Sequence, residues 1–229
     1  MPAESSVDPP HGVSAEAFLP VSATQRVLSQ LRREVITAEL EPGGVIRESE
    51  IAARFGVSKT PVREALQTLL IEDFVTVFPR RGYMVRPVGI NDIGHMMALR
   101  SYIEPQLTGI AALERNQLLI EDLEAALQRQ HEATHDFQER LAGATEFHWL
   151  IARVSKNDRA LRLLRNYFDE TTRLHYVFKP VREHVVSHVE LNAHRKILDA
   201  IIAGDPDRAR QGMQSHLNEA KETLLRSFY

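Results

Sequence analysis

The chain has 229 residues, enough for two modest domains, and its 43% hydrophobic and 26% charged residues are ordinary for a globular protein. It holds no cysteine, which excludes disulfides, thiol catalysis and zinc–thiolate sites. We find neither an apolar run long enough to span a membrane nor a secretory leader, so we expect a cytoplasmic protein that does not enter a membrane. The net charge is −3, but residues 21–88 carry ten Lys/Arg against eight Asp/Glu, which permits a local phosphate-binding surface.

The N-terminal residues separate into a tail and a helix. Residues 1–20 contain four prolines and no apolar period, so we expect a disordered tail. From Val27 to Ile36 the apolar residues share one helical face, which predicts a helix. This helix must end before Pro42 and the two glycines that follow it.

Two shorter helices follow, separated by a glycine. The first is predicted over Glu48–Phe55, and Gly56 ends it. Ser58 is placed to cap the second, because a serine side chain can accept a hydrogen bond from a free N–H of the first turn. Apolar residues at helical spacing predict the buried face of this helix: Val62, Ala65, Leu66, Leu69 and Leu70.

After Asp73 the apolar period shortens to that of β-strands. Residues 74–78 predict one strand, residues 79–82 a turn and residues 83–85 a returning strand. From Asn91 onward the patterns are helical, with breaks expected near Asn116, Gly143, Asn157, Pro180 and Gly204. The sequence therefore predicts a mainly α protein of two domains, residues 21–88 and residues 89–229.

Helix, glycine turn, helix and β-hairpin are the elements of a winged helix-turn-helix, whose second helix enters the major groove of DNA. The start of that helix carries hydroxyls and cations suited to phosphates and guanine edges: Ser58, Lys59, Thr60 and Arg63. The hairpin tip adds two cations and a glycine that permits close approach to DNA: Arg80, Arg81 and Gly82. Helix capping alone explains Ser58, but two adjacent arginines at a hairpin tip have no packing role. We therefore expect this domain to bind DNA.

Three stretches of this domain, residues 31–43, 55–66 and 79–82, resemble the GntR family of transcription regulators. The resemblance implies a regulator rather than an enzyme, with operator contacts on the seven residues just named. Ser49 departs from it, because many relatives carry an arginine there, and Arg47 lies nearby. Asp73 replaces a frequent glycine, a tolerable change because aspartate can adopt the left-handed conformation. One recognition helix reads few bases, so we expect a homodimer on a palindromic double-stranded DNA operator.

The C-terminal domain resembles the helical effector-binding domain called FCD, which occurs in the FadR branch of that family. The resemblance rests on residues 146–148, 192–201 and 215–217, and Arg100 with Glu104 fits the opening helix of that domain. In metal-binding members, three histidines from three helices meet inside the bundle. Those positions are occupied here by His148, His194 and His216.

The resemblance also implies an aspartate one turn before the first histidine, but Ala144 stands there. Glu146 would project from the opposite face of the helix, and Glu190 lies one turn before His194. Three imidazoles still suffice for a divalent metal, with zinc expected first and nickel or manganese as alternatives. A pocket lined by histidines without metal is the other interpretation. We favour the metal, because three buried imidazoles with no common partner would be costly to desolvate.

Arg100 is the residue that we expect to hold an effector, since a guanidinium binds a carboxylate through two hydrogen bonds. Its alternative role is an ion pair with Glu104, four residues later. Because the aspartate is missing, one coordination position of the metal is left open. We expect a small organic acid, such as a sugar acid or hydroxy acid, to fill it and so to control the operator binding of a repressor. Two alternative functions stay open: a metal-free regulator that binds an acyl-CoA-type thioester, and a histidine-ligated metallohydrolase.

Overall fold

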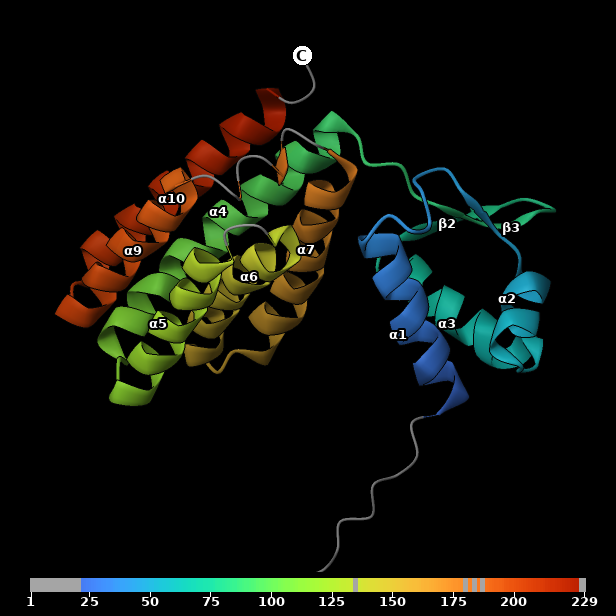
Figure 1. Ribbon diagram of the computed structural model, residues 1–229, viewed down its shortest axis with the longest axis horizontal. Coiled ribbons are helices and arrows are strands. Elements are labelled where there is room, and N and C mark those ends of the chain that lie inside the picture. Colours follow the sequence, from blue (N-terminus) through green and yellow to red (C-terminus); the bar gives the residue numbers. More distant parts are fainter. Residues whose placement is uncertain (1–21, 134–135, 179–180, 183–184, 186–187, 227–229) are drawn as a thin grey trace, which may run out of the picture.

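The computed structural model describes residues 22–133, 136–178, 181–182, 185 and 188–226, and it divides into two units (Figure 1). A small N-terminal domain of helices and strands lies beside a larger C-terminal bundle of helices. The expected tail, residues 1–20, and the expected break at Pro180 lie outside the described residues. Within the part of the chain that the structure describes, no helix is long and apolar enough to cross a membrane.

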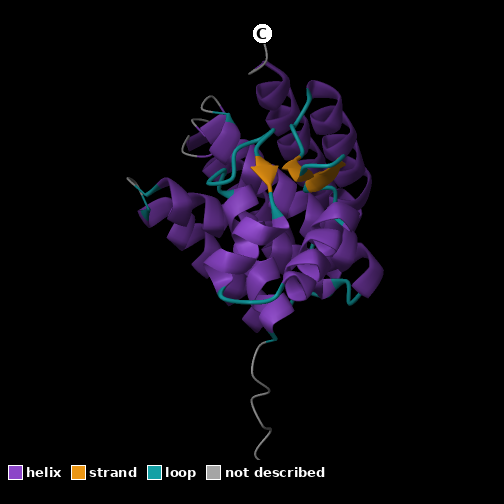
Figure 2. Ribbon diagram, turned by 90° about the vertical axis from the view of Figure 1, so that its right-hand side faces the viewer, coloured by secondary structure: helices purple, strands orange, loops and turns teal. Residues whose placement is uncertain are grey.

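The described residues of the N-terminal domain form a winged helix-turn-helix. Three antiparallel strands, in the order β1-β3-β2, make its small sheet (Figure 2). The elements are α1 (Ala23–Ile36), β1 (Val45–Ile46), α2 (Glu48–Phe55), α3 (Lys59–Ile71), β2 (Val75–Phe78) and β3 (Gly82–Val85). The two predicted strands are confirmed. Strand β1 was not predicted, because two residues are too short to show a period.

Local chemistry sets the ends of these helices. The side chain of Ser22 accepts a hydrogen bond from the backbone N–H of Gln25 at 3.1 Å, so α1 begins earlier than its apolar pattern indicates. Gly56 ends α2 with a φ of 65°, and Asp73 adopts the left-handed φ of 62° expected of it. Ser58 does occupy the N-cap position of α3, but its side chain makes no capping hydrogen bond. The predicted capping role of Ser58 is therefore wrong, and the exposed hydroxyl is available for other contacts.

The C-terminal domain is a bundle in which the long helix α4 contacts α6, α7, α9 and α10. Its described helices are α4 (Ile90–Leu113), α5 (Gln117–Glu132), α6 (Phe137–Val154), α7 (Asp158–Val177), α9 (His188–Ala203) and α10 (Pro206–Arg226). The side chains of Asn116 and Asn157 cap α5 and α7, at two of the predicted breaks. Gly204, with a φ of 68°, follows the end of α9 at a third.

The break predicted at Gly143 is wrong, because this residue lies within α6. Helix α6 packs closely against α5 at this point. A Cβ atom at position 143 would lie 2.8 Å from the backbone nitrogen of Gln130 and 2.9 Å from the carbonyl oxygen of Ala126. The glycine thus permits close helix packing and does not end a helix.

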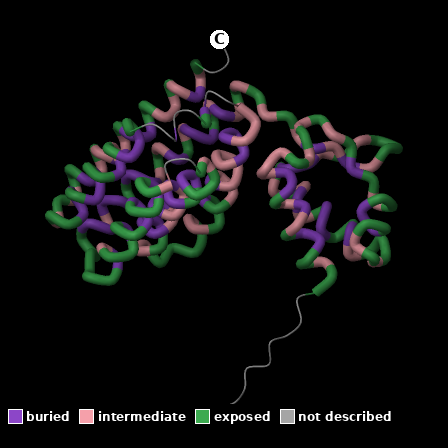
Figure 3. Tube along the Cα trace, viewed as in Figure 1, coloured by how far each residue is buried: buried purple, intermediate pink, exposed green. Residues whose placement is uncertain are grey.

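Each domain has its own hydrophobic interior (Figure 3). In the N-terminal domain the predicted faces of α1 and α3 meet the sheet around Phe74, which is buried with Leu31 and Leu66. In the bundle the interior is built mainly from α4, α5, α6, α9 and α10, and it includes the fully buried Phe147, whose ring stacks on that of His194. Burial of these apolar side chains is the main force that holds each domain together.

Helix α7 of the bundle contacts the N-terminal domain, and α4 adds an ion pair between Asp92 and Arg86 at 3.0 Å. The guanidinium of Arg173 donates to the carbonyl oxygen of Arg86 at 2.5 Å, and the amide of Asn166 donates to the carbonyl oxygen of Glu72 at 3.3 Å. Burial at this junction raises the pKa of Asp169 to about 6 and that of Glu170 to about 7, although nearby arginines oppose both shifts. The described residues of the two domains therefore meet through polar groups, most of which are carried on α7.

Candidate nucleic-acid interface and metal centre

The start of α3 presents all four residues predicted for the major groove to solvent: Ser58, Lys59, Thr60 and Arg63. Arg63 is not free in this state. Its Nε and Nη2 atoms donate to the carboxylate of Glu48, at 3.0 and 2.8 Å. Because the Arg63 side chain is 58% exposed, water weakens this ion pair, and a nucleic acid can compete with Glu48 for the guanidinium.

The hairpin between β2 and β3 exposes Arg80 and Arg81 at its tip. Arg81 lies over the ring of Phe78, 5.3 Å from its centroid, which orients the side chain on the hairpin. Gly82 has a φ of 110°, and a Cβ atom there would lie 2.5 Å from the carbonyl oxygen of Ile46. The fold therefore requires glycine at position 82 for packing against β1, a reason distinct from the expected approach to DNA.

A surface depression joins the hairpin tip to the first turns of α2 and α3. Four cations and one carboxylate face it, the carboxylate being that of Glu48. Its lining is Val45, Arg47, Glu48, Ser49, Lys59, Arg80, Arg81 and Gly82. An exposed concave surface with this excess of positive charge suits a phosphodiester backbone.

The three histidines singled out in the sequence meet inside the bundle. His148 comes from α6, His194 from α9 and His216 from α10, and all three are buried. Their Nε2 atoms form a triangle with 3.2 Å along each side. Four tetrahedral ligands at zinc–nitrogen distances of about 2.0–2.1 Å are separated by about 3.3 Å, so the three nitrogens fit such an ion.

Hydrogen bonds orient two of these rings. Nδ1 of His148 donates to the carboxylate of Glu104 at 2.6 Å, and Nδ1 of His194 donates to the amide oxygen of Gln130 at 3.0 Å. A neutral imidazole carries one proton, so in both rings Nε2 then points a lone pair at the other. Two such atoms 3.2 Å apart repel each other unless a cation lies between them. This is the chemistry of a metal-ligand set.

The surroundings keep the site in a form that can bind metal. Burial, with the neighbouring His194 and His148, holds the pKa of His216 well below its ordinary value. Burial alone would raise the pKa of Glu104, but the charge of Arg100 and the hydrogen bonds from Arg100 and His148 outweigh it and lower that pKa to about 2. A neutral imidazole beside an ionised carboxylate is the arrangement that supports metal binding.

The sequence analysis did not identify Glu104 and Gln130 as the residues that support the histidines. Glu104 lies 44 residues from His148 along the chain, and Gln130 lies 64 residues from His194. Helical spacing relates residues that are only three or four positions apart, so it carries no signal for such contacts.

A cavity of about 50 Å³ lies against the histidine cluster. Arg100, Ala144, His148 and His216 line it, together with Glu190, whose pKa burial raises to about 7. Ala144 thus faces the space where the resemblance implies an aspartate. Glu146 points away from the cavity, as predicted, and its carboxylate pairs with Arg129 near the surface at 3.0 Å. Arg100 lies at the wall of this cavity, where it donates to Thr171 Oγ1 at 3.2 Å. The ion pair with Glu104, given as its alternative role, is present in the structure.

A winged helix-turn-helix with an exposed cationic face, joined to a helical bundle, defines the class of DNA-binding transcription regulators. Residues 23–85 match the family model described as bacterial regulatory proteins, gntR family, and residues 95–219 match that of the FCD domain. The chain belongs to the GntR family and carries an FCD domain. The members of this family that it resembles are regulators, not enzymes.

Individual proteins similar to this chain are also named as transcription regulators. The chain is 32% identical over 200 residues, 86% of its length and 83% of the relative's, to an HTH-type transcriptional regulator in an unstable DNA locus of Streptomyces ambofaciens. It is 27% identical to the HTH-type transcriptional repressor RspR of Escherichia coli, over 87% of this chain and 88% of that protein. The crystal structure of a GntR transcriptional regulator from Rhodococcus sp. RHA1 matches with a TM-score of 0.76 and 26% identity, covering 89% of this chain and 97% of that one.

Proposed function

We propose that this regulator is a repressor that binds a palindromic operator as a homodimer in the cytoplasm. Support for operator binding comes from the cationic depression between α3 and the hairpin, where Lys59 and Arg81 face the same space. Two-fold pairing supplies the second recognition helix that a specific site needs. Repression is the activity named for the similar RspR protein.

We further propose that His148, His194 and His216 hold one divalent metal, zinc in the first place, with nickel or manganese as alternatives. The Nε2 triangle with 3.2 Å sides is the observation that carries this assignment. When bound, the ion supplies a positive coordination position that attracts an anionic ligand. Glu104 and Gln130 keep the rings of His148 and His194 turned toward it.

The effector proposed for the adjacent cavity is a small carboxylate, such as a hydroxy acid or sugar acid. A cavity of about 50 Å³ has room for only a few water molecules, which favours a short hydroxy acid first, a larger sugar acid next and a long acyl thioester last. Arg100 lines the same cavity and presents a guanidinium to an anion. Its ion pair with Glu104 holds it in place before the ligand arrives.

Helix α7 gives the effector a path to the DNA-binding domain. On one face it carries Thr171, which contacts Arg100, and on another Arg173, which holds the carbonyl oxygen of Arg86. A ligand that draws Arg100 toward the metal would shift Thr171 and with it the contacts of α7 at the junction. The largest change in operator affinity is then set by the difference between the ligand's binding free energies for the two domain arrangements.

Calorimetric titration tests this mechanism with L-lactate, D-gluconate and uncharged D-glucose as probes. Wild type, Arg100→Lys and chelator-treated protein are compared, and the lysine variant keeps the charge beside Glu104. We expect an acid to bind wild type and to weaken operator binding, with binding reduced in the other two preparations. An effector that is uncharged, or that binds all three preparations equally, contradicts the mechanism.

A further inference from the structure

One arginine in the cationic depression was not assigned to DNA by the sequence analysis. Arg47 is the N-cap residue of α2, with an extended backbone and no capping hydrogen bond from its side chain. Its guanidinium pairs with Glu50 at 2.7 Å, and both side chains are about 60% exposed (61% and 59%). Such an exposed pair contributes little to stability, so Arg47 is not required to hold the fold together.

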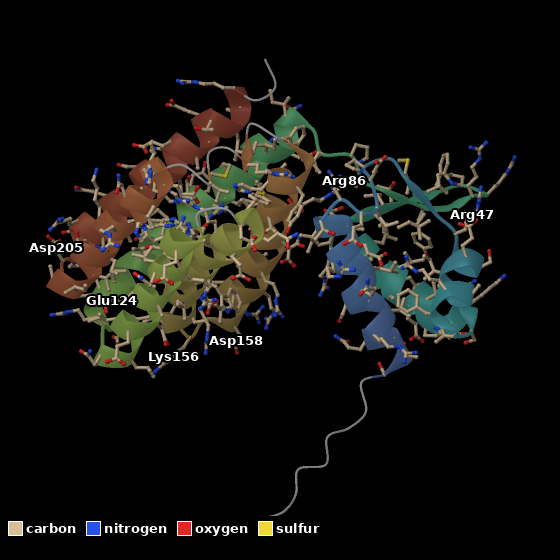
Figure 4. The ribbon with its side chains drawn as sticks, in the orientation of Figure 1. Arg47, Arg86, Glu124, Lys156, Asp158 and Asp205 are labelled. Carbon is tan, nitrogen blue, oxygen red and sulfur yellow. The ribbon has the colours of Figure 1, made fainter. Side chains whose placement is uncertain are left out.

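The backbone of Arg47 is tied to the base of the hairpin. The preceding residue, Ile46, pairs with Tyr83 across β1 and β3. Gly82 packs so closely that a Cβ atom on it would lie 3.6 Å from the Cα atom of Arg47. Arg47 and the hairpin therefore hold a constant relative position. Figure 4 shows Arg47 on the side of the domain that faces away from the bundle, whereas Arg86 lies toward the bundle.

We infer that Arg47 binds a DNA phosphate between the groove that receives α3 and the groove that receives the hairpin tip. The inference rests on the proposed DNA-binding function and deepens it. Arg47 lines one depression with Lys59, at the start of α3, and with Arg80, at the hairpin tip. If these two elements enter neighbouring grooves, the phosphate backbone that separates the grooves runs past the residue between them. Ser49 lines the same depression without a charge.

The salt dependence of DNA binding tests this contact. Affinities of wild type, Arg47→Ala and Arg33→Ala are measured on a duplex selected from a random pool and on an unrelated duplex of equal length. Arg33 is the matched control, because it too is about half exposed and pairs with an exposed glutamate of the same domain (50% and 51%). Loss of one phosphate contact lowers the slope of log affinity against log salt by about 0.9 per chain, hence by about 1.8 for a dimer.

For Arg47→Ala we expect this reduced slope on both duplexes. The affinity ratio of wild type to variant should then shrink by about tenfold between about 50 and 200 mM salt. Arg33→Ala should behave as wild type. Glu50→Gln should strengthen binding, because it removes a carboxylate that competes for the guanidinium. In the double variant Arg47→Ala/Ser49→Arg, a cation returned to the same depression should restore most of the slope.

Two results would overturn the assignment. One is a salt slope for Arg47→Ala equal to that of Arg33→Ala, with the melting temperature of both variants unchanged. The other is a loss confined to the selected duplex and to one base pair of it, which would mean that Arg47 reads a base. Failure of the proposed DNA-binding surface looks different: wild type would then bind neither duplex, or Arg63→Ala would bind the selected duplex as well as wild type.

Discussion

Removal of metal should lower the melting temperature of this protein by about 10 °C. The ion proposed for this site would join α6, α9 and α10 through side chains that are distant in the sequence, so it would bind the folded chain and not the unfolded one. At a free metal concentration of about 1,000 times the dissociation constant this linkage stabilises the fold by about 4 kcal/mol. For a chain of this size, each kcal/mol shifts the melting temperature by about 2–4 °C.

Scanning calorimetry of chelator-treated protein with and without added zinc measures this difference. His194→Ala should abolish the zinc-dependent increment in melting temperature, because His194 is 0% exposed and supplies one corner of the Nε2 triangle. His175→Ala is the matched control: His175 is also buried and lines the same cavity, but it is not part of the cluster. The increment is compared within each variant, so a loss of stability from the substitution itself does not affect the comparison.

The reasoning would be refuted by wild-type protein that melts at the same temperature in chelator and in zinc. It would also fail if His175→Ala removed the increment as completely as His194→Ala does. In either case the three histidines would not form the site that their geometry indicates.

Three further predictions concern the DNA surface, the domain junction and a helix contact. Arg63→Ala should weaken operator binding at least tenfold in a fluorescence anisotropy titration, by removing a base contact of about 1–3 kcal/mol per half-site; unchanged affinity would mean a wrong recognition helix. The pKa of Glu170 is about 7 in the folded chain against an ordinary 4.5, so the folded state holds this proton more tightly than the unfolded state does. The contribution of the protonated carboxyl to the free energy of unfolding is full below about pH 4.5 and is lost as pH rises through 7. Glu170→Gln, beside Arg86, Asp73, Arg173 and Asp92, should therefore flatten the melting temperature between pH 5 and 8, and an unaltered pH profile would exclude this assignment. Gly143→Ala should destabilise the bundle by about 1–3 kcal/mol in urea unfolding, because the added methyl meets the backbone of α5; equal stability would show that the helices can separate at no cost.

Much of the architecture follows from the sequence alone. The apolar spacing of α1 and α3 gives the buried face of each helix, and Gly56 marks the turn between α2 and α3. The shortened period after Asp73 indicates the hairpin, with its two arginines at the tip. These features are local, since each depends on residues within one or two helical turns or one strand pair.

The tertiary structure alone decided which distant groups meet. His148 is oriented by Glu104 and His194 by Gln130, and no spacing along the chain relates these pairs. Gly143 was misread as a helix break for the same reason, because its role is to permit contact between α6 and α5, and the packing of Gly82 against β1 also could not be seen in the sequence. Periodicity reports which face of an element is buried, but the identity of the partner across that face depends on how the elements pack. The chemistry of the histidine site is therefore a property of the packed bundle.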